Sequence, residues 1–321
     1  MKQGRALPAV AGTPQRRSRR PHPRRSLALL AVALSALLPL VALSGCSSGA
    51  SSASGSGSPA APGKLLLFAG SASQPPTEEA IKLFKEKTGI EVEAVFGSSG
   101  TVLSQMELTK KGDLYFPGSS DFMEKAKSAG DVLPETEARI AYLVPAINVQ
   151  KGNPKHVETL ADLTKPGIKV AIADPESVCV GLYAAEIIDK QFTPAQKAAL
   201  KANLVNYTAS CDKTAAAISL KAADAVIGWS VFQYWDPEGI ETVKLPAAQI
   251  SRVGYLPIAV VKYTTDQAAA QQFVDFLAGP EGQAIFAKHR YFATPEEAFA
   301  YVGAEKPVGG QLTLPADWLT Q

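Results

Sequence analysis

Two serine-rich turns hold the residues whose types and spacing could do chemistry in this chain of 321 residues. The first follows the apolar run Leu65–Phe68, and the second follows Val92–Phe96. A helical pattern begins after each turn, so its hydroxyls would lie beside the free backbone N–H groups of a helix start. The pair predicts one anionic ligand held between the turns. The hydroxyls belong to Ser71, Ser73, Ser98 and Ser99.

Two other roles for these serines are open. Serine is a common turn former and helix N-cap, which needs no ligand at all. A serine hydrolase would need a histidine and an acid, yet the chain has no Gly-x-Ser-x-Gly elbow, and only His156 and His289 follow the N-terminal region. We therefore expect a binding protein and no enzyme.

The first 45 residues have the pattern of a secretory leader. Residues 1–25 hold eight basic residues and no acidic one, and an apolar run from Leu27 to Leu43 follows. The ending Leu43-Ser44-Gly45-Cys46 resembles the lipobox of bacterial lipoproteins, which implies cleavage before Cys46 and a lipid anchor on its sulfur. A retained transmembrane helix is the alternative, and the export route, general or twin-arginine, is open. Residues 46–63, rich in Ser, Ala, Gly and Pro, predict a flexible tether.

Removal of the leader changes the charge of the protein. It takes 8 of the 32 basic residues and none of the 30 acidic ones, so the net charge becomes −6 instead of +2. A nucleic-acid partner is therefore not expected. With Cys46 lipidated, Cys179 and Cys211 remain, and a disulfide between them is the default in an oxidising exterior, with free thiols as the alternative. The sequence contains no Cys-x-x-Cys pair, so a metal-ion site is not expected.

After the tether, short apolar runs alternate with helical patterns, which predicts an α/β fold of mostly parallel sheets flanked by helices. Two extended runs that contain proline, Arg139–Val149 and Tyr255–Val261, bracket the middle third of the chain. We expect the chain to cross there between two lobes. Lobe 1 would be discontinuous, formed by residues 64–143 and 257–321, and lobe 2 would be the inserted residues 144–256. A cleft between such lobes is where a small ligand binds.

Capping residues mark several expected elements. The helix Thr77–Thr88 has an apolar face and ends at Gly89. The run Ala225–Trp229 is expected to be a buried strand.

Arg252 and Lys262 fall in loops, where they could reach an anion in the cleft or face solvent.

Taken together, several segments resemble the periplasmic molybdate- and tungstate-binding proteins of ABC importers, which have the two-lobe type II periplasmic-binding-protein fold. The likeness extends from Lys64 to about Phe292. Each segment is weak alone, and their order and spacing carry the match. The segments are Phe68–Ser71, Phe96–Thr101, Gly112–Leu114, Asp174–Glu176, Gly181–Ala184, Tyr255–Val261 and Phe276–Pro280.

The resemblance implies that a tetrahedral oxyanion is bound by Ser71 and Ser99 from lobe 1. Lobe 2 would add backbone N–H groups at Val180 and near Lys213. At the position of a family tyrosine this chain has Trp229, which offers only an indole N–H. The expected ligand-binding residues are Ser71, Ser73, Ser98, Ser99, Val180, Lys213 and Trp229.

The implied function is a monomeric, extracytoplasmic lipoprotein, anchored at Cys46, that delivers molybdate or tungstate to an ABC permease and needs no cofactor. Sulfate, phosphate or an organic phosphate is the alternative ligand. A sensor or adhesion protein with the same fold is another possibility, and an extracytoplasmic hydrolase is a weaker one.

Overall fold

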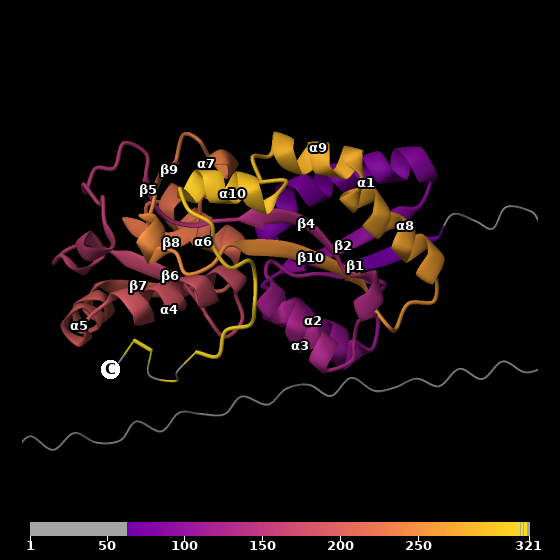
Figure 1. Ribbon diagram of the computed structural model, residues 1–321, viewed down its shortest axis with the longest axis horizontal. Coiled ribbons are helices and arrows are strands. Elements are labelled where there is room, and N and C mark those ends of the chain that lie inside the picture. The colour runs from indigo at the N-terminus through magenta and orange to yellow at the C-terminus, as the bar shows by residue number, and fades with distance from the viewer. Residues whose placement is uncertain (1–62, 315, 317, 320–321) are drawn as a thin grey trace, which may run out of the picture. The chain divides into compact units, whose positions relative to one another are not determined.

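The computed structural model describes residues 63–314, 316, 318 and 319. The predicted leader, the lipidation site Cys46 and the tether up to residue 62 lie outside the described residues. Within the described part of the chain, no helix is long and apolar enough to cross a membrane. The described residues form two five-stranded sheets, each flanked by helices, so the α/β two-lobe architecture is confirmed (Figure 1).

The first sheet has the strand order β2-β1-β3-β10-β4. Strand β1 runs parallel to β2 and β3, whereas β10 runs antiparallel to β3 and β4. The sheet is therefore mixed, where the sequence predicted a mostly parallel one. Its strands are β1 (Lys64–Gly70), β2 (Glu91–Gly97), β3 (Leu114–Phe116), β4 (Ala138–Leu143) and β10 (Gly254–Val260).

Helices cover both faces of this sheet (Figure 1). Helix α1 buries Ala80 and Phe84, and the Phe84 ring packs edge-on against Phe273 with 5.0 Å between centroids. It ends where Gly89 adopts a left-handed φ of 75°, as the sequence predicted, and begins three residues before the predicted Thr77. The helices are α1 (Gln74–Thr88), α2 (Ser99–Thr109), α3 (Ser120–Ser128), α8 (Gln267–Ala278) and α9 (Pro280–Lys288).

The second sheet has the order β7-β6-β8-β5-β9 and is also mixed. Strand β6 is parallel to β7 and β8, and β5 is antiparallel to β8 and β9. The strands are β5 (Pro145–Gln150), β6 (Val170–Ala173), β7 (Leu204–Thr208), β8 (Ala225–Trp229) and β9 (Ile240–Val243). The helices are α4 (Cys179–Gln191), α5 (Pro194–Asn203), α6 (Cys211–Ser219) and α7 (Phe232–Trp235).

The chain crosses between the sheets at two main points. The run Arg139–Val149, expected as one strand, is two strands, β4 of the first sheet and β5 of the second, with Val144 between them. The return crossing lies just before Gly254, where β10 joins the first sheet, and therefore slightly before the expected boundary at residue 256.

The C-terminal tail departs from the expected assignment to lobe 1. After helix α10 (Pro295–Val302), a parallel bridge joins Val308 to Val253. Ala298, Val302 and Trp318 pack into the apolar core of the second sheet. The tail therefore contributes apolar surface to lobe 2.

Candidate functional site

Ser71 lies in a short 3-10 turn (Ser71–Ser73) directly after β1, and it faces the start of α6 in the other lobe. Its Oγ accepts hydrogen bonds from the backbone N–H groups of Cys211 (3.1 Å) and Asp212 (3.3 Å). The first N–H groups of a helix have no partner within the helix and carry its partial positive charge. A hydroxyl oxygen of lobe 1 thus occupies an acceptor position that an anion oxygen could equally take.

A cavity of about 280 Å³ opens beside Ser71, between the two serine turns and the start of α6. Its volume is near the lower end of the roughly 300–1,000 Å³ typical of small-molecule sites. Ser210 Oγ, in the wall, is buried and has no hydrogen-bond partner among the described residues. Polar side chains from both lobes line the cavity: Ser71, Gln74, Ser98, Thr101, Ser210, Asp212 and Lys213.

Ser98 combines the two roles that the sequence left open. Its Oγ accepts a hydrogen bond from the Thr101 N–H (3.1 Å), which makes it the N-cap of α2, and it donates to Thr101 Oγ1 at 2.7 Å. It also lines the cavity. Ser73, in contrast, is buried and donates to the Gly70 carbonyl at 3.2 Å, so it acts as a turn former.

Ser99 is placed differently from the expectation. Its Oγ accepts a hydrogen bond from the Gly118 N–H (2.9 Å), its carbonyl accepts one from the Tyr115 hydroxyl (3.0 Å), and it is 1% exposed. A side chain at Gly70 would put its Cβ 2.8 Å from Ser99 Oγ, so only glycine fits there. The structure therefore brings Ser71 together with Ser98 and not with Ser99 at the cavity.

Gly118 was missed by the sequence reasoning. The sequence Pro117-Gly118 after strand β3 indicates a turn, but nothing in it shows that this turn contacts the other lobe. In the structure this turn is the third one of lobe 1 that meets the cleft, because a Cβ on Gly118 would collide with Cys179 Sγ of lobe 2 and lie 2.8 Å from Ala72 Cβ.

Cys179 and Cys211 are the first residues of α4 and α6. Both are buried free thiols with 3.3 Å between their Sγ atoms. A disulfide has about 2.05 Å between its sulfurs, so the expected bridge is not formed in this structure. Burial raises the pKa of the Cys211 thiol, and the hydrogen bond to Cys179 adds to this, while the backbone N–H of Val180 acts in the opposite direction. The Val180 amide thus has a sulfur as its neighbour.

Trp229 does not line the cavity. It ends β8 opposite Pro145 of β5, is fully buried, and packs edge-on against Tyr183 with 4.8 Å between ring centroids. Its Nε1 has no hydrogen-bond partner in the described part of the chain. The residue belongs to the core at the crossing between the lobes.

The lobes also meet through backbone groups, since the Gly100 N–H donates to the Ser177 carbonyl at 2.8 Å.

The two histidines do not form a catalytic pair with a serine. His289 Nε2 lies 2.8 Å from Glu79 Oε2, and no hydrogen bond among the described residues joins His156 or His289 to a serine. No group of three or more Asp, Glu, His or Cys residues in the described ranges could hold a metal ion. Arg252 is buried in an ion-pair cluster and does not reach the cavity.

Comparison with known proteins agrees with this architecture. The sequence pattern of the family "bacterial extracellular solute-binding protein" matches residues 65–291. The chain is 26% identical over 239 residues to the molybdate-binding protein ModA of Escherichia coli, covering 71% of this chain and 89% of that protein. It is 26% identical over 295 residues to the sulfate-binding protein of Synechococcus elongatus, covering 83% of this chain and 82% of the relative.

Among solved structures, the sulfate-binding protein SubI of Mycobacterium tuberculosis has the same fold, with a TM-score of 0.65 at 19% identity, and the match covers 76% of this chain and 93% of SubI. Proteins of this kind bind solutes for ABC importers and are not enzymes. The chain belongs to the family of bacterial extracellular solute-binding proteins.

Proposed function

We propose that this solute-binding protein captures a small tetrahedral oxyanion between its lobes and delivers it to an ABC permease, with molybdate or tungstate as the first candidate ligand. One observation carries the proposal: the Ser71 hydroxyl oxygen accepts two hydrogen bonds from the start of α6, at the edge of a cavity lined by further hydroxyls. The identity to a molybdate-binding relative supports the choice of ligand.

The binding step follows from the hydrogen-bond capacity of Ser71. As an acceptor it engages the Cys211 and Asp212 amides. Rotation of its side chain would release both N–H groups to an anion oxygen and turn its own O–H toward the same ligand. One side-chain movement thereby provides three donors. Hydrogen bonds to charged groups contribute about 1.5–3 kcal/mol each, against about 0.5–1.5 kcal/mol for neutral pairs, so an anion competes well for these donors.

The remaining cavity wall refines the ligand. Ser98 and Thr101 add hydroxyls from lobe 1, and the exposed Lys213 adds a positive charge from lobe 2. Asp212 places a carboxylate on the same wall. The Asp212 carboxylate can accept a hydrogen bond from a protonated anion such as hydrogen phosphate, and the positive charge of Lys213 beside it offsets its repulsion of a fully ionised anion. Sulfate is the second candidate, supported by the sulfate-binding relative.

Closure would follow from contacts with both lobes at once. A ligand shifts a conformational equilibrium only by its differential affinity for the two states. Ser71 and Ser98 belong to lobe 1, and the amides of Cys211 and Asp212 belong to lobe 2, so the full donor set exists only when the lobes meet. We further propose that the protein acts as a monomer, anchored outside the cytoplasm by lipid on Cys46.

The test is binding of a panel of anions. Thermal unfolding of the protein would be followed with millimolar molybdate, tungstate, sulfate or phosphate. A ligand at 100 times its Kd adds about 2.7 kcal/mol to the free energy of unfolding, which raises Tm by several degrees. We expect the largest rise with molybdate or tungstate. If no anion in the panel changes Tm, and calorimetry detects no binding, the proposal is wrong.

A further inference from the structure

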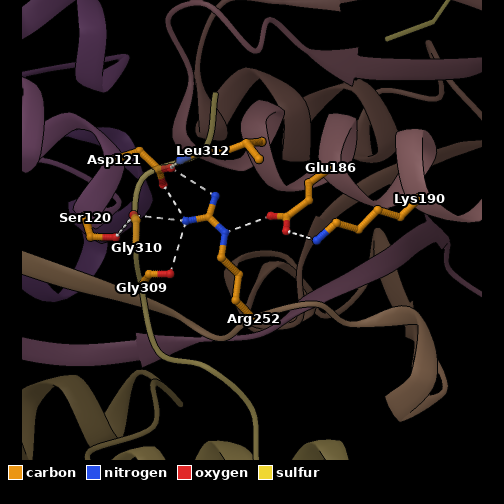
Figure 2. Close-up of polar contacts among 8 residues, drawn as sticks. All are labelled: Ser120, Asp121, Glu186, Lys190, Arg252, Gly309, Gly310 and Leu312. Atoms are coloured by element: carbon orange, nitrogen blue, oxygen red, sulfur yellow. Dashed lines mark hydrogen bonds and ion pairs between the residues drawn. The ribbon is translucent and has the colours of Figure 1, made fainter. Parts of the chain in front are cut away.

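Arg252 lies at the return crossing between the lobes, and its side chain is only 6% exposed. Its guanidinium donates to both carboxylate oxygens of Asp121, from Nη1 and Nη2 at 3.0 Å each. Its Nε donates to Glu186 Oε2 at 2.8 Å. Asp121 is at the start of α3 in lobe 1, and Glu186 is on α4 in lobe 2, so one buried cation joins the two lobes (Figure 2).

The C-terminal tail closes the other side of this cluster. Arg252 Nη1 also donates to the carbonyls of Gly309 (3.4 Å) and Gly310 (3.2 Å). The Leu312 N–H donates to Asp121 Oδ1 at 2.8 Å, and the Ser120 hydroxyl donates to the Gly310 carbonyl at 2.7 Å. Figure 2 shows the tail passing beside the Arg252–Asp121 pair. Each of the three guanidinium nitrogens thus donates to at least one protein oxygen.

The same cluster is linked through α3 and α4 to the start of α6, where Cys211 N–H donates to Ser71 at the anion cavity and Cys211 Sγ lies 3.3 Å from Cys179 Sγ on α4. The turn before α3 holds Gly118, which meets Cys179 at the start of α4. The Arg252 guanidinium also lies 4.0 Å from the centre of the Tyr183 ring on α4, and Tyr183 packs against Trp229. Movement of α3 away from α4 therefore disturbs the cavity and the Arg252 cluster together.

We propose that Arg252, Asp121 and Glu186 form an inter-lobe latch, a positioning device that holds the lobes closed through contacts of the protein alone and sets how fast a bound anion leaves. A buried ion pair adds little to stability when it replaces apolar packing, but loss of one partner leaves an uncompensated charge. Opening the lobes by separating Asp121 from Glu186 breaks the charged hydrogen bonds to one of them, because Arg252 can follow only one, and these bonds therefore oppose opening. The role of the latch in anion release rests on the proposed function.

Asp121→Asn and Glu186→Gln test the latch, because each keeps the shape of the side chain and removes one charge. Asp189→Asn is the matched control: Asp189 accepts from the buried Lys197 at 2.8 Å, and both lie in lobe 2. Thermal unfolding first establishes that each variant folds. Small-angle X-ray scattering without anion then reports lobe separation, and stopped-flow tryptophan fluorescence reports molybdate dissociation.

For both latch variants we expect a larger radius of gyration than for wild type and an approximately tenfold faster dissociation, with association changed by less than about threefold, since affinity differences within one site reside mainly in dissociation. The Asp189→Asn control should match wild type in both measurements. The proposal is wrong if both latch variants have the radius of gyration and the molybdate dissociation rate of the wild type. If wild type binds no anion, the proposed function fails, and the scattering comparison alone decides the latch.

Discussion

The Ser71 hydroxyl oxygen accepts a hydrogen bond from the backbone N–H of Cys211, 3.1 Å away and in the other lobe. The neighbouring Asp212 N–H points to the same oxygen at 3.3 Å. Both N–H groups are strong donors to an anion because they belong to a helix start. A neutral hydroxyl is a weak match for them, and an anion oxygen is a better one.

Replacement of Ser71 by alanine should weaken anion binding. Ser71→Ala removes one hydrogen-bond donor to the charged ligand, so we expect Kd for molybdate or tungstate to rise at least tenfold, about 1.4 kcal/mol. Isothermal titration calorimetry measures it. Ser73→Ala is the matched control, because Ser73 donates only to the Gly70 carbonyl. Equal affinities of wild type and Ser71→Ala would rule out the site.

The charge of Asp212 should affect which anion is preferred. Its carboxylate lines the cavity next to Lys213. Asp212→Asn removes a negative charge while its backbone N–H stays in place, so we expect tighter binding of sulfate, which carries no proton near neutral pH, and weaker binding of hydrogen phosphate. Calorimetry with both anions gives the ratio of the two Kd values. A ratio unchanged from wild type would show that Asp212 does not contact the ligand.

Addition of a methyl group at Gly118 should separate the lobes. The new Cβ would overlap Cys179 Sγ and lie 2.8 Å from Ala72 Cβ. We expect Gly118→Ala to fold with a lower Tm and a larger radius of gyration, since overpacking a buried contact typically costs about 1–3 kcal/mol. The double variant Gly118→Ala with Cys179→Ala removes the sulfur and should recover part of the loss. No recovery would mean that the strain lies within lobe 1.

The sequence predicted best what short-range chemistry determines. Helix α1 and its left-handed cap at Gly89 follow from capping and periodicity, which involve neighbouring residues only. The position of Ser71 and Ser98 at one cavity could be predicted for a similar reason, because a strand, a serine turn and a helix start are adjacent in the chain. The break between β4 and β5 was missed because Arg139–Val149 has one continuous extended pattern, whereas Pro145 within it begins an inner strand of the other sheet.

Long-range contacts account for the remaining differences. Trp229 was expected to bind ligand, but its position is determined by Pro145 across the sheet and by Tyr183 on α4. The sequence could not decide whether Arg252 faces solvent or the cleft, because its carboxylate partners Asp121 and Glu186 are 131 and 66 residues away in the chain. No local pattern connects residues at such distances. Likewise, a local reading of Cys179 and Cys211 could not distinguish a bridge from two adjacent thiols.

The Arg252 cluster should also make stability depend on acidity. Burial alone would raise the pKa of Glu186, but hydrogen bonds from Lys190 and Arg252 outweigh it and hold the pKa below the usual value. A carboxyl whose pKa is lower in the folded state than in the unfolded one contributes stability above its unfolded pKa, about 4.3 for glutamate, and loses it as pH falls through the folded value.

We therefore expect the free energy of unfolding to fall with decreasing pH below about 4.5, and to fall less steeply in Glu186→Gln. Asp131 and Asp162, whose pKa values are also lowered by hydrogen bonds that outweigh burial, account for part of the remaining slope. Urea denaturation at pH intervals between about 3 and 6 provides the measurement. Glu86→Gln is the control, since Glu86 is exposed on α1 and forms no ion pair with any described residue. If wild type and Glu186→Gln have the same slope, the Arg252 and Lys190 contacts do not stabilise the charged form of Glu186.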